Sequence, residues 1–87
     1  MRPKNPIHPG EILLEEFLKP MNLSQREFAA KIDWTPAKLN EVVTGKRGIT
    51  ADSALDLSDA LKTSAELWMN LQVQWDLHRA EKQRKAS

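Results

Sequence analysis

Apolar residues recur along this chain at intervals of three and four positions, which is the period of an α-helix with one buried side. Proline, glycine and short polar stretches interrupt this pattern, and the strict alternation of a half-buried strand is missing from the sequence. The pattern therefore predicts an all-α fold of five helices with short connectors. The expected helices cover residues 9–19, 24–32, 36–43, 51–61 and about 65–80.

Residues 24–43 predict two short helices joined by a tight turn. Ser24 begins the first, and Glu27 follows three residues later, which is the capping-box pattern. Thr35 and Pro36 begin the second, because a hydroxyl can cap a helix and proline suits the first helical position, where no amide hydrogen is needed. Together they form a helix-turn-helix, the unit that lays its second helix in the major groove of DNA.

The two ends of the chain lack this organisation. Residues 1–8 contain two prolines and no helical period, which predicts an extended leader. The helix-turn-helix domain is expected over residues 9–80, with Thr63 and Glu66 forming a further capping box ahead of its last helix. Residues 81–87 are rich in lysine and arginine and are expected to form a flexible basic tail.

The composition fits one small globular domain. Of the 87 residues, 40% are hydrophobic and 29% are charged, which is ordinary for a folded protein. The absence of cysteine excludes a disulfide framework, a thiol nucleophile and a zinc–thiolate site. No apolar run approaches the roughly 20 residues that span a bilayer, and the first residues lack the apolar core of a signal peptide. We therefore expect a protein of the reducing cytoplasm with no membrane association.

The formal net charge is only +1, but the charges are segregated along the chain. Residues 51–78 carry five acidic side chains and one lysine, whereas residues 79–87 carry four basic side chains and one glutamate. A protein that neutralises phosphates needs its positive charge on one face rather than throughout. The overall charge therefore does not by itself argue for a nucleic-acid partner.

The second helix of the pair has a distinct outward side. Leu39, Val42 and Val43 are spaced to face a core, which turns Lys38 and Glu41 outward. Such a helix meets DNA through its first residues, where lysine can donate to guanine and asparagine can pair with adenine. An ordinary solvated helix face is the alternative interpretation. The predicted base contacts are Thr35, Pro36, Ala37, Lys38, Asn40 and Glu41.

A second group of residues is expected to contact the DNA backbone. Ser24 and Gln25 begin the first helix of the pair, where free backbone amides and the glutamine side chain can bind phosphate. Lys46 and Arg47 follow the second helix in a loop whose glycines permit tight turns. Capping alone at Ser24 and a merely solvated loop are the simpler alternatives. The predicted phosphate contacts are Ser24, Gln25, Thr44, Lys46 and Arg47.

The last expected helix has more apolar surface than one side of a terminal helix requires. Trp68, Leu71 and Trp75 are spaced at three and four positions and so share one face. Large aromatic side chains are enriched at the centres of protein interfaces. We predict that these three residues form a homodimer interface, and the alternative is a core that lies wholly within one chain.

The sequence shows no recognisable catalytic or metal-binding constellation. His8 and His78 are far apart and have no cluster of further ligands at metal-binding spacing. Neither accompanies a nucleophile in a known motif, and no glycine-rich phosphate loop occurs. We therefore expect no enzymatic activity, no metal and no cofactor.

Three motifs follow one another along the chain, namely HPGE at residues 8–11, GKRGIT at residues 45–50 and ELWMNLQ at residues 66–72. Together with the helix-turn-helix pattern, they resemble the lambda-repressor-like (XRE) helix-turn-helix family and, within it, the HigA-type antitoxins of bacterial toxin–antitoxin systems. The resemblance covers about residues 7–78. In that family, the glutamine that corresponds to Gln25 contacts the DNA backbone.

Two residues in the turn depart from the family pattern. Asp33 replaces a glycine that commonly opens the turn, and aspartate tolerates the left-handed backbone required there. Trp34 replaces a small aliphatic residue. We expect its ring to pack in the core beneath the second helix, although stacking at the DNA is an alternative.

The residues themselves favour a dimeric, sequence-specific repressor that binds double-stranded DNA at a roughly palindromic operator. Its half-sites would lie about one helical turn, or a multiple, apart. The resemblance alone implies the antitoxin role, in which the protein binds and silences a HigB-like ribonuclease toxin and represses the operon that encodes both. A stand-alone XRE-type repressor, and a helical interaction module that does not bind DNA, are the two rival hypotheses.

Overall fold

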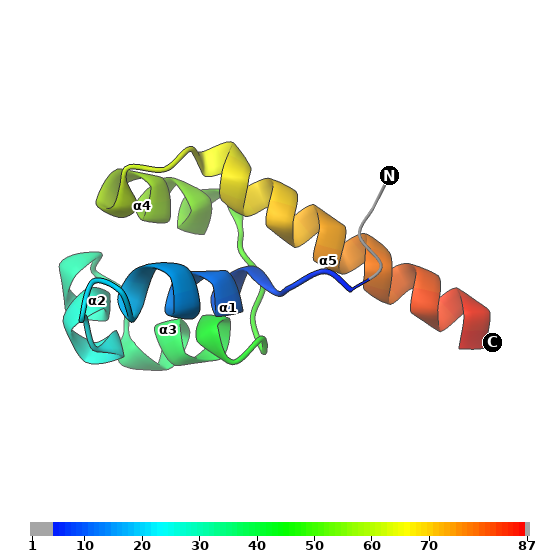
Figure 1. Ribbon diagram of the computed structural model, residues 1–87, viewed down its shortest axis with the longest axis horizontal. Helices are drawn as coiled ribbons and strands as arrows, with labels where there is room; N and C mark the ends of the chain where they lie inside the picture. The colour runs from blue at the N-terminus through cyan, green and yellow to red at the C-terminus, as the bar shows by residue number, and fades with distance from the viewer. Residues whose placement is uncertain (1–4, 87) are drawn as a thin grey trace.

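The computed structural model describes residues 5–86, and they form an all-helical domain with an elongated last helix (Figure 1). Residues 5–8 of the expected leader are not helical, and the rest of the leader lies outside the described part of the chain. The helices follow in the order α1 (Pro9–Ile12), η1 (Leu13–Leu18), α2 (Gln25–Lys31), α3 (Pro36–Val43), α4 (Ala51–Leu61) and α5 (Ala65–Ala86).

The first expected helix changes its geometry part-way. After the α-helical turn of α1, the segment η1 is a π-helix, in which an amide bonds the carbonyl five residues earlier, as Lys19 does to Leu14 at 3.0 Å. This wider turn brings residues five positions apart toward one side of the helix. Leu13 and Leu18 have that spacing, and both side chains are fully buried.

Side-chain caps set the boundaries of the helix-turn-helix pair. The Ser24 hydroxyl accepts the Glu27 amide at 3.0 Å, and the Glu27 carboxylate accepts the Ser24 amide at 3.3 Å, which confirms the predicted capping box. Thr35 caps α3 by accepting the Lys38 amide at 3.1 Å. Asp33 in the intervening turn has a φ of 60°, so the expected left-handed turn is confirmed.

The predicted start of α5 at residue 65 is confirmed, but the predicted capping box of Thr63 and Glu66 is wrong. The Ser64 hydroxyl, rather than that of Thr63, accepts the amide of Leu67, the third residue of the helix, at 3.1 Å. The Thr63 hydroxyl instead accepts the indole N–H of Trp68 at 2.7 Å. A buried indole needs a partner, and Thr63 provides it.

The prediction of a flexible basic tail from residue 81 is also wrong, because α5 continues as a helix to Ala86. The sequence AEKQRKA consists of residues with high helix propensity. Arg84 and Lys85 lie in the last turn, where positive charge complements the helix dipole. With 22 residues, α5 is about 33 Å long and projects beyond the other helices (Figure 1).

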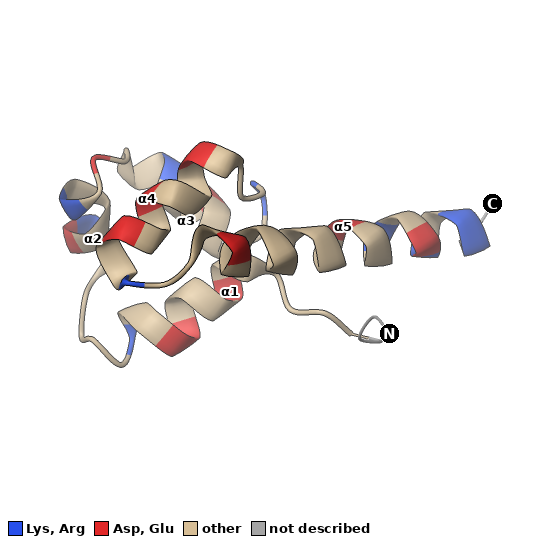
Figure 2. Cartoon of the chain, turned by 90° about the horizontal axis from the view of Figure 1, so that it is seen from above, with Lys and Arg blue, Asp and Glu red and all other residues tan. Residues whose placement is uncertain are grey.

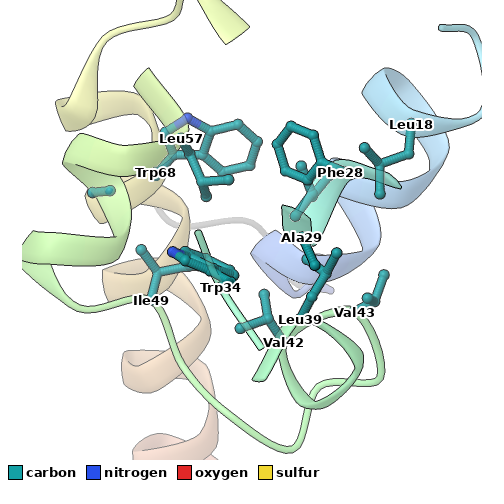
Figure 3. Close-up of a cluster of buried hydrophobic side chains, with 12 residues drawn as sticks. Leu18, Phe28, Ala29, Trp34, Leu39, Val42, Val43, Ile49, Leu57 and Trp68 are labelled. Carbon is teal, nitrogen blue, oxygen red and sulfur yellow. The ribbon is translucent and has the colours of Figure 1, made fainter. Parts of the chain in front are cut away.

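The core lies where η1, α2, α3, α4 and the first half of α5 converge (Figure 3). Phe28, Leu39, Leu57 and Trp68 are among its fully buried side chains. Trp34 is 6% exposed and belongs to this core, as expected. These side chains fix how α3 lies on the rest of the domain and so decide which side of α3 faces outward.

Gly10 allows α1 to pack directly on the end of α3. A Cβ atom at this position would lie 1.7 Å from the carbonyl oxygen of Val42, which is backbone and cannot move aside. Only glycine is compatible with so close an approach. The HPGE motif therefore contributes to the placement of α3.

Candidate nucleic-acid interface

The outward side of α3 is free of the core, as the spacing of its apolar residues predicts. Leu39, Val42 and Val43 are buried against the domain. The side chains proposed to meet DNA bases lie on the other sides of the helix. Of these, Thr35, Pro36, Ala37 and Asn40 are exposed, and Lys38 and Glu41 are partly buried.

The two helices of the pair are joined at their outward edge by a side-chain hydrogen bond. The Asn40 amide on α3 donates to the Gln25 side-chain oxygen at the start of α2, at 3.4 Å. The structure therefore brings together a predicted base contact and a predicted phosphate contact that are 15 positions apart in sequence. Ser24, which precedes Gln25, is also exposed while it caps α2.

Lys38 lies across the face of Trp34, with its ammonium 4.3 Å from the ring centre. The indole N–H of Trp34 donates to the carboxylate of Asp56 on α4 at 2.9 Å. The ring is thus held by α4 on one side and holds the lysine on the other. A lysine over an aromatic face gains a modest attraction, roughly 0.5–1 kcal/mol at exposed sites, which limits the orientations of its head group.

Arg47 and Glu41 form an ion pair at the end of α3. Both Nε and Nη2 of Arg47 donate to one oxygen of Glu41, at 3.1 and 2.7 Å. The side chains remain about half exposed, so the pair is accessible from solvent. To bind a phosphate, the Arg47 guanidinium would have to release the Glu41 carboxylate or contact both groups at once.

The loop after α3 carries the remaining predicted phosphate contacts. Gly45 has a φ of 80°, which turns the chain away from the helix axis. Lys46 and Arg47 are exposed beyond this turn. The Thr44 hydroxyl donates to the Asn40 carbonyl at 2.7 Å, so it must rotate before it can donate to a phosphate.

Figure 2 shows an uneven distribution of charge over the molecule, with acidic residues on α1 and α4 and basic residues at the far end of α5. Near the outward side of α3, the cations Lys38, Lys46 and Arg47 come from the helix and its following loop. Glu41 lies among these cations and pairs with Arg47, so Lys38 and Lys46 are the cations of this side that the ion pair leaves available for phosphate.

His8 joins the start of α1 to α5, a structural role that the sequence did not reveal. Its Nδ1 accepts the Gly10 amide at 2.9 Å and so caps α1, while its ring packs edge-on against Trp75, with 5.2 Å between centroids. Burial lowers the pKa of His8 below its usual value of 6.5, more than the opposing effect of Asp76 raises it. A side-chain acceptor just before Pro9 was the available signal for this cap.

The predicted dimer interface requires a correction at Trp68. Its side chain is 0% exposed within the single chain and packs against Phe17, so it presents no surface to a partner. Leu71 and Trp75 are partly buried, and their part in an interface stays a prediction. The exposed apolar side chains of α5 instead include Leu67, Val73 and Leu77.

A family model described as Helix-turn-helix, HTH_3, matches residues 14–68 of this chain. The chain belongs to this helix-turn-helix family. Over 80 residues it is 46% identical to virulence-associated protein I of Dichelobacter nodosus, an alignment that covers 92% of this chain and 74% of that protein.

Two solved structures extend the likeness of this helix-turn-helix protein to its fold. The Pseudomonas aeruginosa antitoxin HigA with the higBA promoter superposes with a TM-score of 0.90 and 39% identity, over 94% of this chain and 89% of that one. Antitoxin GraA in complex with its operator gives a TM-score of 0.86 and 43% identity, over 94% and 83%. These findings confirm the resemblance to HigA-type proteins and the all-α fold expected from the sequence.

Residues 5–86 of this helix-turn-helix protein are helical apart from short connectors and the first few residues. No helix in that range is both long enough and apolar enough to span a membrane. Within the same residues, no three His, Asp or Glu side chains come together in a way that could hold a metal ion.

Proposed function

We propose that this protein is a sequence-specific DNA-binding repressor of the antitoxin type, acting in the bacterial cytoplasm. In this proposal, α3 enters the major groove, and Thr35, Ala37, Lys38 and the other outward residues of α3 meet base edges. The start of α2 and the loop after α3 contact the phosphates on either side. The observation that carries the proposal is the convergence of these elements, with Gln25 and Asn40 in direct contact.

The geometry supports separate roles for the two groups of contacts. Asn40 and the N-terminal turn of α3 lie on the rigid helix, where a small number of side chains can read bases precisely. Gln25, Lys46 and Arg47 flank the helix at its two sides and carry donors suited to phosphate oxygens. Affinity for DNA would then come mainly from the phosphate contacts, and discrimination between base sequences from α3.

The toxin partner is the second part of the proposal. Two similar solved structures are described as antitoxins, one with the higBA promoter and one in complex with its operator. By likeness to these proteins, the chain would bind and neutralise a HigB-like ribonuclease toxin and repress the operon that encodes both. Coexpression with the toxin encoded beside its gene should restore growth. Unrelieved toxicity with both proteins folded would leave a stand-alone repressor.

A homodimer is the third part, and α5 is the segment proposed to form it. Val73 and Leu77 are 46% and 38% exposed on the part of α5 that leads away from the core. Two-fold pairing of such a helix would bury these side chains and place one α3 on each half of a palindromic operator.

The deciding experiment is selection from a pool of randomised duplexes at near-physiological salt, followed by sequencing of the bound DNA. An inverted repeat with half-sites about one helical turn apart, or a multiple of it, would support a dimeric repressor. Absence of enrichment by a folded protein would contradict the DNA-binding proposal. It would favour a protein-interaction module.

A further inference from the structure

Gln72 is the last residue of the ELWMNLQ motif and has no role in the function proposed above. Its side chain is 8% exposed, although glutamine is usually found at the surface. A buried amide must have hydrogen-bond partners to be tolerated, and those partners show what it holds in place.

The partners of Gln72 join α5 to the loop that follows α3. Its Oε1 accepts the backbone amide of Ile49 at 2.7 Å, across 23 positions of sequence. Its Nε2 donates to Oδ1 of Asp76, one turn further along α5, at 2.9 Å. Asp76 therefore fixes which end of the amide faces the loop, because a carboxylate can only accept.

The backbone of Gly48 packs directly on the same amide group. A Cβ atom at residue 48 would lie 3.0 Å from Nε2, 3.1 Å from Cδ and 3.2 Å from Oε1 of Gln72. The side chain of Gln72 thus meets the loop over two consecutive residues. Ile49 itself is buried in the core, which anchors the loop at the same point.

The opposite end of the loop is attached to α3. The Glu41 carbonyl accepts the backbone amides of Lys46 and Arg47, at 2.8 and 3.1 Å. The backbones of Lys46 and Arg47 are therefore attached to α3, and the two residues that follow them are held by Gln72. A cleft of about 360 Å³ lies beside this contact and is lined by residues 45–50 of the loop and by Gln72, Trp75, Asp76 and Arg79 of α5.

We propose that Gln72 is a positioning residue for DNA binding, which holds the loop of Lys46 and Arg47 at the distance from α3 that lets both cations reach phosphates. The inference rests on the proposed DNA-binding function. Gln72 touches no DNA in this account. It acts through the Ile49 amide and sets the phosphate contacts without altering which bases α3 reads.

The test is the salt dependence of binding to two duplexes, the selected operator and a mixed-sequence duplex of the same length. The variant Gln72→Met keeps the volume and charge of the side chain but leaves the Ile49 amide without its acceptor. We expect the slope of log affinity against log salt to become shallower by roughly 1–2, as one or two cations lose their phosphates. The ratio of operator to mixed-sequence affinity should stay the same.

A charge-neutral exchange provides the rescue. Gln72→Glu retains an acceptor for Ile49 but places a second carboxylate beside Asp76, and should disturb the loop. The double variant Gln72→Glu/Asp76→Asn restores a donor and an acceptor with the original net charge, and should recover the wild-type slope. If Gln72→Met folds poorly, the comparison of Gln72→Glu with the double variant tests the proposal in its place. Asn70→Met, at an exposed position of α5, is the matched control for Gln72→Met.

Three results would overturn the inference. One is a wild-type slope in a folded Gln72→Met or Gln72→Glu protein, and another is a failure of the double variant to recover the slope. The third is a selective loss for the operator alone, which would mean that Gln72 acts through α3. If wild-type protein binds neither duplex, the proposed function fails and the inference with it, a result distinct from an unchanged slope in variants of a binding protein.

Discussion

The ammonium of Lys38 and the ring of Trp34 face one another at 4.3 Å, at the first turn of the helix proposed to read DNA. Trp34 in turn donates to Asp56 of α4. A side chain that is already held in one place loses less conformational entropy on binding. The tryptophan in the turn thus has a structural role in the core and a second effect on the lysine above it.

Replacing Lys38 and Asn40 together by alanine should flatten sequence preference while leaving the protein folded. Each good contact to a base edge gives roughly 1–3 kcal/mol of discrimination, so the preference for operator over scrambled duplex should fall at least about tenfold. Competition binding with the two duplexes measures this ratio. An unchanged ratio would remove both residues from the set of base contacts.

Removing Arg47 should weaken binding to all duplexes by a similar factor. Its proposed partner is a phosphate, so Arg47→Ala should also reduce the salt slope by about 1. The ion pair with Glu41 is half exposed, and its loss should change the free energy of unfolding by less than about 1 kcal/mol. A loss confined to one sequence would instead indicate base recognition.

Gly10→Ala should destabilise the domain severely, because the new methyl group would meet the Val42 carbonyl at 1.7 Å. Overpacking of this kind against rigid backbone should cost about 3 kcal/mol or more. Gly45→Ala is the matched control, since its Cβ would lie 3.8 Å from the nearest atom and only the positive φ is unfavourable, at about 1 kcal/mol. Urea denaturation of both variants should show this order.

Stability should fall as the pH drops below about 6.5, because of His8. The folded state lowers the pKa of His8, so the unfolded chain binds its proton first, and the free energy of unfolding decreases as the pH falls through that range. Above the ordinary pKa the contribution is complete. Urea titrations at about pH 7.5 and 5.5 measure the difference, and His8→Asn, which keeps a capping acceptor, should reduce it. A difference that persists in the variant would assign the effect to other groups.

Leu77→Glu should dissociate the proposed dimer without unfolding the chain. Leu77 is exposed in the single chain, so a charge costs little there, but it would be unfavourable in a paired apolar surface. Sedimentation should show a monomer, with unchanged helical content by circular dichroism. A dimer that resists the substitution would place the interface away from this part of α5.

The sequence predicted those features that depend on a few neighbouring residues. The cap at Ser24, the restart at Thr35 and the left-handed Asp33 each follow from local hydrogen bonding and local backbone preference. The residues on the outward side of α3 could also be predicted, because helical spacing determines which residues share a face.

Features that depend on distant neighbours could not be predicted in the same way. Helical spacing grouped Trp68 with Trp75, but only the fold shows that Phe17 covers the former and His8 lies against the latter. The contact of Gln72 with Ile49 likewise spans segments whose approach no local pattern reveals. The continuation of α5 through residue 86 has a different explanation, because a basic composition predicts disorder whereas the individual residues of this segment favour a helix.

The three tryptophans lie in three different environments of the molecule. Trp34 joins α3 to α4, Trp68 lies in the core, and Trp75 is partly exposed where α5 meets His8. Their fluorescence therefore reports on separate events without any added label. Variants that keep one tryptophan at a time would allow DNA binding, unfolding and contact with a partner at α5 to be followed individually, each in its own titration.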